Sequence, residues 1–166
     1  MLPEIGHFAL ILALLLSALQ CFFGIAGPAL GRERWQAAVA PAVAGQFAMV
    51  TVAIGCLAAS FLNFDFSVAY VAQNSNSALP TLYRVSALWG AHEGSLLLWS
   101  WILGCWTVAV ALASRKLPAS FAARVLGVLG LVSFGFFLFT LATSNPFIRL
   151  DPPAPDGRDL NPLLQD

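Results

Sequence analysis

Long apolar stretches alternate with short polar connections along this chain. Four stretches lack Asp, Glu, Lys and Arg altogether, namely 5–29, 37–61, 95–113 and 125–145. Each is long enough to cross about 30 Å of hydrocarbon as an α-helix that rises about 1.5 Å per residue. The pattern predicts an all-α polytopic membrane protein with four transmembrane helices near 5–29, 37–61, 93–113 and 123–144.

The outer loop 63–92, between the second and third predicted helices, is too long for a simple connector. Apolar and smaller or polar residues alternate from Phe64 to Tyr70, which predicts an extended ribbon with an aromatic face toward the bilayer or a partner. A polar turn follows at 73–77, and the segment 79–89 reads as a short interfacial helix with Arg84 directed at water or phosphate. The loop is therefore expected to be structured.

Composition supports the membrane interpretation. The chain is 59% hydrophobic and 10% charged, whereas a soluble domain is typically about one quarter charged. Lys and Arg also set the expected orientation. One set of connections carries Arg32, Arg34, Arg115, Lys116 and Arg124, and the other carries Arg84, Arg149 and Arg158. This bias predicts that both ends, the outer loop and the outer tail 145–166 lie outside. The expected partner of such a chain is membrane lipid, and no nucleic acid is expected.

Two further features are expected to be structural. The first apolar stretch lacks a positively charged leader and is too long for a signal-peptide core, so it is predicted to remain as a membrane span. Cys21, Cys56 and Cys105 each lie within a predicted span without a Cys-x-x-Cys partner, so we expect packing roles and no metal site. Gly24, Gly27 and Gly31 should thin the inner end of the first helix. Ala123 and Gly127 form a small-xxx-small pair that should admit a neighbouring helix.

The run Trp89-Gly90-Ala91-His92-Glu93-Gly94-Ser95-Leu96-Leu97-Leu98-Trp99 places a titratable pair where a polar loop meets an apolar helix. His92, Trp99 and Trp106 recur every seven residues and so fall on nearly one helix face, with Ser95 one turn from His92. Such a face could hold a planar apolar cofactor such as haem. Alternatively, the tryptophans form an aromatic belt at the lipid interface, and the glycines permit close helix contacts. The spacing leaves both interpretations open.

Several motifs in order give the chain a resemblance to a known family. They are Tyr70-Val71-Ala72, Asn74-Ser75-Asn76, Leu79-Pro80, Tyr83-Arg84, the run 89–99, Ser144-Asn145-Pro146-Phe147 and Gly157-Arg158-Asp159-Leu160-Asn161-Pro162-Leu163-Leu164-Gln165. Over its whole length the chain resembles the start of the CcmF/NrfE-type cytochrome c haem lyase subunits. The resemblance implies a bacterial inner (plasma) membrane protein whose outer face is periplasmic, and it implies that this sequence is the N-terminal part of a longer one.

The resemblance also implies a function. Members of this family receive haem from a periplasmic haem chaperone and help to attach it to the Cys-x-x-Cys-His thiols of apocytochrome c, together with thiol-reducing maturation subunits. The implied cofactor is haem, with its iron ligands beyond Asp166, so the chain is expected to be a component of the lyase and not an enzyme by itself.

The candidate residues for a haem-site wall or a partner surface are Trp89, His92, Glu93, Ser95 and Trp99, and no catalytic residue is assigned. The alternative function is a non-catalytic scaffold or transporter-like subunit whose aromatic stripe only contacts lipid.

Overall fold

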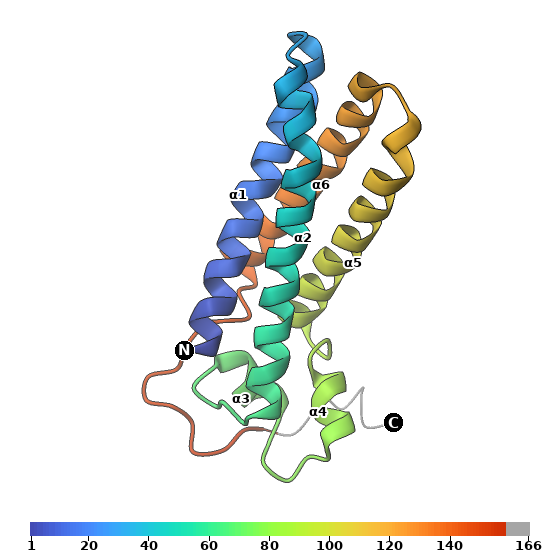
Figure 1. The fold of residues 1–166 in the computed structure, drawn as a ribbon. Coiled ribbons are helices and arrows are strands. Elements are labelled where there is room, and N and C mark those ends of the chain that lie inside the picture. The colour runs from blue at the N-terminus through green and yellow to red at the C-terminus, as the bar shows by residue number, and fades with distance from the viewer. Residues whose placement is uncertain (159–166) are drawn as a thin grey trace.

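Four long helices form an elongated bundle in the computed structural model, which describes residues 1–158 (Figure 1). They are α1 (Leu2–Ala29), α2 (Glu33–Leu62), α5 (His92–Ala113) and α6 (Ala119–Thr143). A short 3-10 helix, η1 (Ser114–Lys116), joins α5 to α6. All four long helices are apolar and long enough to cross a membrane. The predicted fold class, an all-α membrane protein with four spanning helices, is confirmed.

Most helix ends lie outside the uncharged stretches. Helix α2 begins at Glu33 and α6 at Ala119, four residues before each predicted start, because the charged residues at these ends lie within the first turns. Pro3 occupies the first turn of α1, where proline removes no helical hydrogen bond. Helix α5 begins at His92, so Trp89 precedes the helix.

The outer loop is structured, as predicted, but it contains no ribbon. Two short helices occupy it, α3 (Ala69–Asn74) and α4 (Thr81–Ala87). Within the predicted ribbon, Val68 forms an isolated antiparallel bridge with Arg149 of the tail, and α3 begins at the next residue. Tyr70 is 3% exposed and so does not face lipid. The alternating pattern was misleading because burial in this loop follows from contacts with the tail and the bundle.

Helix α1 lies between α2 and α6, and small residues allow its close approach to α6. A Cβ atom added to Gly24 would lie 2.5 Å from the Cα atom of Gly127 and 2.6 Å from the carbonyl oxygen of Ala123. The predicted small-xxx-small contact is therefore confirmed, with Gly24 as its partner. Gln20 strengthens the same interface by donating from its side-chain amide to the carbonyl oxygen of Leu126 at 2.7 Å. Such small and polar contacts drive helix association in lipid.

Gly31 does not thin α1 as expected, because it lies in the turn to α2. Its φ of 63° belongs to the left-handed region, and no atom lies within 4 Å of a Cβ added there. Glycine adopts this conformation without the steric cost that other residues incur. Gly31 therefore makes the tight turn possible.

Helix α5 packs through one side only. Trp101 faces the bundle, stacks on Phe47 with ring centroids 6.3 Å apart, and donates from its indole N–H to the hydroxyl of Thr51 at 3.1 Å. On the other side, Trp99 and Trp106 are 65% and 67% exposed. This exposed side of α5 is available to lipid or to further protein.

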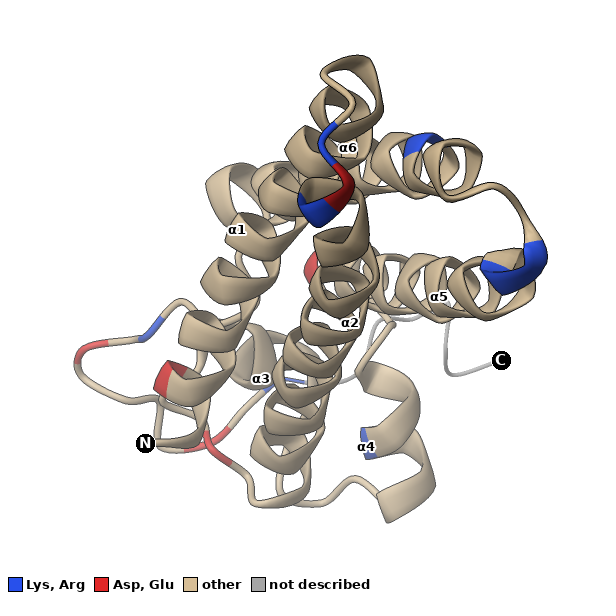
Figure 2. Ribbon diagram, turned by 45° about the horizontal axis from the view of Figure 1, so that its top comes forward, with Lys and Arg blue, Asp and Glu red and all other residues tan. Residues whose placement is uncertain are grey.

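Both the N-terminus and the segment after α6 lie at the bundle end that carries α3 and α4 (Figure 1). We call this the outer end, and the opposite end, with the α1–α2 turn and η1, the inner end. Five cations lie at the inner end, namely Arg32 and Arg34 at the α1–α2 turn, Arg115 and Lys116 in η1, and Arg124 near the start of α6. Figure 2 shows Lys and Arg at this end of the bundle. The predicted placement of both ends and the loop on one face therefore agrees with the fold, up to residue 158.

Candidate functional site at the outer end

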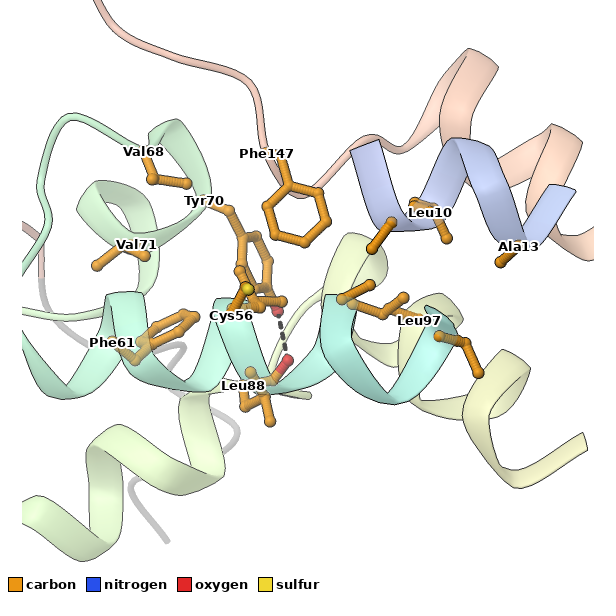
Figure 3. Close-up of a cluster of buried hydrophobic side chains, with 14 of the residues drawn as sticks. Leu10, Ala13, Cys56, Phe61, Val68, Tyr70, Val71, Leu88, Leu97 and Phe147 are labelled. Carbon is orange, nitrogen blue, oxygen red and sulfur yellow. Dashed lines mark hydrogen bonds between the residues drawn. The ribbon is translucent and has the colours of Figure 1, made fainter. Parts of the chain in front are cut away.

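A layer of loop and tail covers the outer end of the bundle, and we call residues 63–91 and 144–158 the outer cap. Its core includes Val68, Tyr70 and Val71, which pack with Phe61 of α2 and Leu97 of α5 (Figure 3). Tyr70 and Phe61 meet edge to face with ring centroids 5.5 Å apart. The cap therefore shares one continuous hydrophobic core with the membrane helices.

Tyr70 fixes the chain just before α5. Its hydroxyl lies 3.3 Å from the carbonyl oxygen of Leu88 (Figure 3) and 3.3 Å from that of Ala87. It also accepts a hydrogen bond from the Ala91 N–H at 3.3 Å. Burial raises the pKa of Tyr70 to about 12, and the charge of Glu93 acts in the same direction. The phenol is therefore neutral at physiological pH and can both donate and accept.

Gly94 makes this arrangement possible. A Cβ atom at residue 94 would overlap the carbonyl oxygen of Leu88 and lie 2.5 Å from the Tyr70 hydroxyl oxygen. Only glycine lets the backbone before α5 fold back against its first turn. The glycine in the Trp89–Trp99 run therefore serves a close approach within the chain itself.

The tail is attached to the cap and to α1 by an ionic cluster centred on Arg149. Its guanidinium donates to Glu4 of α1, with the Nε atom 2.8 Å from Oε1, and it also contacts Ser67 and Asp65. These three segments are distant in sequence. Arg149 therefore joins α1, the outer loop and the tail.

A second set of contacts surrounds Asn145, which follows α6. Its side-chain oxygen accepts the Phe147 N–H at 3.0 Å, and its nitrogen lies 3.1 Å from Nδ1 of His7. Phe147 is buried against Gly6, where an added Cβ would lie 2.5 Å from the ring. The Asn-Pro-Phe motif thus docks the start of the tail onto α1.

Farther along, the tail closes over the outer loop. Asp156 accepts hydrogen bonds from the backbone N–H and the hydroxyl of Ser77, and these bonds lower the pKa of its carboxyl group. The Arg158 N–H donates to the carbonyl oxygen of Ala72 at 2.8 Å. Gly157 permits this contact, because a Cβ there would overlap the carbonyl oxygen of Ser75. The remainder of the tail motif, 159–165, lies outside the described residues.

The five candidate residues gather where the cap meets α5, but they do not form one enclosed pocket. Ser95 donates to the carbonyl oxygen of Trp89 at 2.7 Å, so these two lie together. His92 and Trp99 are exposed along the same side of α5, and Glu93 is half-buried. They occupy the rim of the outer cap and the exposed side of the helix.

An apolar groove between α5 and α6 opens beside His92. Its volume is about 420 Å³, and it is lined by Leu96, Phe136, Phe139 and neighbouring α6 residues. The His92 imidazole meets the Phe139 ring edge to face, with centroids 6.2 Å apart. The groove offers flat apolar walls below one imidazole, which suits one side of a planar aromatic ligand. The described residues contain no group of three or more His, Cys, Asp or Glu side chains that could hold a metal ion.

Sequence reasoning missed the structural importance of three residues. The sequence pattern predicts that Tyr70 faces the bilayer or a partner and that Arg84 points at water or phosphate, and it treats Arg149 only as a tail charge. Instead Arg84 donates to the carbonyl oxygen of Leu62 at 3.2 Å, at the C-terminal end of α2, and lies over the Phe64 ring. The long loop length was the available signal, because a structured loop needs buried anchors.

Comparison with known proteins identifies relatives of the whole chain. It is 59% identical to the cytochrome c-type biogenesis protein CcmF of Pseudomonas aeruginosa, an alignment that covers 100% of this chain and 25% of the relative. It is 50% identical to CcmF of Escherichia coli and 45% identical to NrfE of Haemophilus influenzae, again over 100% of this chain and 26% of each relative.

The fold and a family model agree with these relatives. A solved structure named cytochrome c heme lyase CcmF matches with a TM-score of 0.82 and 31% identity, over 89% of this chain and 25% of that one. The family model described as cytochrome C assembly protein matches residues 89–166. The chain thus spans about a quarter of the length of its curated relatives. On this evidence the chain belongs to the CcmF/NrfE family of cytochrome c-type biogenesis proteins.

Proposed function

We propose that this chain is part of a membrane haem lyase that attaches haem covalently to apocytochrome c on the periplasmic side of the bacterial inner membrane. The observation that carries the proposal is the likeness of the whole chain, in sequence and in fold, to a solved haem lyase. The relatives are about four times longer, so the activity belongs to the longer protein.

Within that function, the outer cap and the adjoining side of α5 form one wall of the haem site or of the partner surface. Trp89 and Ser95 are joined by a hydrogen bond at its rim. Trp99 presents its ring outward beside the groove that lies under His92. Flat apolar surfaces of this kind bind the faces of planar ligands.

The residues present fit one side of a haem but not the whole of its iron coordination. His92 supplies a single imidazole, and His7 is already bonded to Asn145. The iron ligands are therefore proposed to lie outside residues 1–166. When bound, haem supplies the vinyl groups to which the two thiols of apocytochrome c add. The contribution of this chain is to position the porphyrin and exclude water from its apolar edge.

The partners follow from the same proposal. Haem is delivered by a periplasmic chaperone, apocytochrome c arrives at the outer face, and thiol-reducing maturation subunits keep its cysteines reduced. The exposed side of α5 contacts the rest of the lyase or lipid. The hydrophobic core shared by the cap and the bundle supports this role, because a docking surface gains affinity when it is ordered before binding.

Substitution of Trp99 tests the proposed wall. Trp99→Ala should reduce covalent haem attachment to a reporter cytochrome c several-fold, measured by haem staining in cells that depend on the variant. Because Trp99 is largely exposed, the amount of protein in the membrane should not change. Ile102→Ala is the matched control, since Ile102 is also an exposed apolar residue of α5.

Normal haem attachment in Trp99→Ala would contradict the proposed wall and favour the alternative of a scaffold whose tryptophans only contact lipid. An equal loss in both variants would indicate a general need for an apolar α5 surface. Purification of the longer protein tests the lyase assignment separately. A haem lyase should show a haem absorption spectrum and should co-purify with other cytochrome c maturation proteins.

A further inference from the structure

The inner ends of the four long helices line a large open cavity that lies away from the proposed haem wall. Its volume is about 770 Å³, well above that of the α5–α6 groove. It is lined by the α1–α2 turn, the first turns of α2 and α6, and the end of α5 with η1. A volume of this size falls within the range of about 300 to 1,000 Å³ that is typical of ligand sites.

The walls and the rim of this inner cavity differ in chemistry. Val39, Ala40, Ala122 and Leu126 provide apolar walls on α2 and α6. The polar lining residues are Glu33, Gln36, Ser114, Arg115 and Ser120. Because Glu33 offsets only one of the five cations at this end of the bundle, the surroundings of these apolar walls remain positive, which matches an amphiphile whose head group is anionic. A soluble anion would gain nothing from the walls, and an uncharged lipid would gain nothing from Arg115.

The charges at this end are not neutralised within the described part of the chain. Its five cations, Arg32, Arg34, Arg115, Lys116 and Arg124, take part in none of the ion pairs found there, which all lie at the outer end. Arg32 stacks on Trp35 instead. Glu33 is the single acid at the inner end, so the net charge is strongly positive (Figure 2).

We propose that the inner cavity binds an anionic phospholipid, with an acyl chain against α2 and α6 and the phosphate at Arg115. Basic pockets between transmembrane helices on the cytoplasmic side commonly hold such head groups. One Lys or Arg near the surface contributes about 1 kcal/mol to anionic lipid binding, which corresponds to about five-fold in affinity. The proposal depends on the cavity and its charges, and not on haem.

Native mass spectrometry of the longer protein, purified in detergent, can test this site. The probes are phosphatidylglycerol and phosphatidylcholine with identical acyl chains. We expect phosphatidylglycerol to be retained several-fold better. Arg115→Gln should lower its retention about five-fold. Arg34→Gln is the matched control, because Arg34 carries the same charge at the same end but does not line the cavity.

A second pair of variants tests the cavity itself without changing charge. Ala40→Trp should fill the cavity and lower the retention of phosphatidylglycerol, whereas Ala44→Trp, one turn farther along the exposed side of α2, should not. Equal retention of the two lipids would overturn the proposal. This is the result expected if another part of the longer protein fills the cavity. An equal loss in Arg115→Gln and Arg34→Gln would also overturn it, because it would indicate general surface charge and no specific site.

Discussion

At the scale of single residues, two positions hold the outer cap against α5. The Tyr70 hydroxyl contacts the backbone of Ala87, Leu88 and Ala91, just before α5. Gly94 lacks the Cβ atom that would overlap Leu88 and the Tyr70 hydroxyl. Neither residue carries reactive chemistry. Their value is to order the backbone next to Trp89, His92 and Trp99, which are the residues of the proposed wall.

The buried phenol of Tyr70 predicts a pH dependence of stability. Its pKa is raised from 10 to about 12 in the folded protein, so between these values the unfolded chain releases the proton while the folded chain keeps it. The free energy of unfolding should therefore fall as pH rises through this window, by at most about 1.4 kcal/mol per pH unit. Thermal unfolding in detergent below pH 10 and between pH 10 and 12 measures the slope.

Tyr70→Phe provides the control for that experiment. The variant should lose about 1 kcal/mol below pH 10, because its hydrogen bonds are absent, and its stability should no longer depend on this ionisation. An equal slope in both proteins would contradict the prediction, because it would mean that Tyr70 has the same pKa in the folded and unfolded states.

Gly94→Ala is expected to destabilise the protein even though alanine favours helices. The added methyl group would overlap the Leu88 carbonyl, and such overpacking typically costs about 1 to 3 kcal/mol. Gly55→Ala on α2 is the matched control, because nothing lies within 4 Å of its Cβ position, and it should be neutral or stabilising by up to about 1 kcal/mol. Unfolding in detergent compares the two variants, and equal stabilities would contradict the close contact.

At the scale of elements, the contact between α1 and α6 depends on missing side chains. The two backbones meet at Gly24 and Gly127, and Gln20 forms a hydrogen bond between the same two helices one turn away. By contrast, α5 contacts the bundle on one side and exposes tryptophans on the other. The bundle thus combines α1, which packs closely against both α2 and α6, with a less covered α5.

Gly24→Ala should lower the melting temperature measurably, with a cost of about 1 to 3 kcal/mol, because its methyl group would meet the backbone of α6. Gly135→Ala, where the space is open, should not. In the double variant Gly24→Ala with Gly127→Ala, the second change should cost less than it does alone, since the helices are already separated. Additive costs would mean that the two glycines do not share one contact.

At the scale of the whole molecule, the structure places both described ends of the chain and the outer cap on the same side of the bundle (Figure 1). The five inner cations lie on the other side (Figure 2). Because Lys and Arg are retained in the cytoplasm, the cap should face the periplasm. The proposed haem wall and the proposed lipid site would then lie on opposite sides of the membrane.

Reporter fusions test this orientation. An enzyme that is active only outside the cytoplasm, fused after Asn76, should be active, and the same enzyme fused after Arg34 should be silent. A cytoplasmic fluorescent reporter at the same two positions provides the reciprocal control. Activity after Arg34 and silence after Asn76 would reverse the orientation, and with it the placement of both proposed sites.

The sequence by itself determined the four membrane helices, the common side of the loop and ends, and the small-residue contact on α6. The exclusion of charged residues from hydrocarbon and the spacing of small residues along a helix are local properties, so both can be recognised in the sequence. The ordered motifs also revealed the family. The predicted ribbon 64–70 was wrong, because the residues that bury Tyr70 come from α2, α5 and the tail.

Only the tertiary structure decided how the cap is held and what the run Trp89–Trp99 presents. Arg149 joins segments 145 and 84 positions apart, and no local pattern specifies such pairs. Likewise, spacing placed His92 and Trp99 on one face of a helix, but only the packing of α5 showed that this face is exposed beside a groove. Which side of an amphipathic or uniformly apolar helix is buried depends on its neighbours, and these are fixed only when the chain folds.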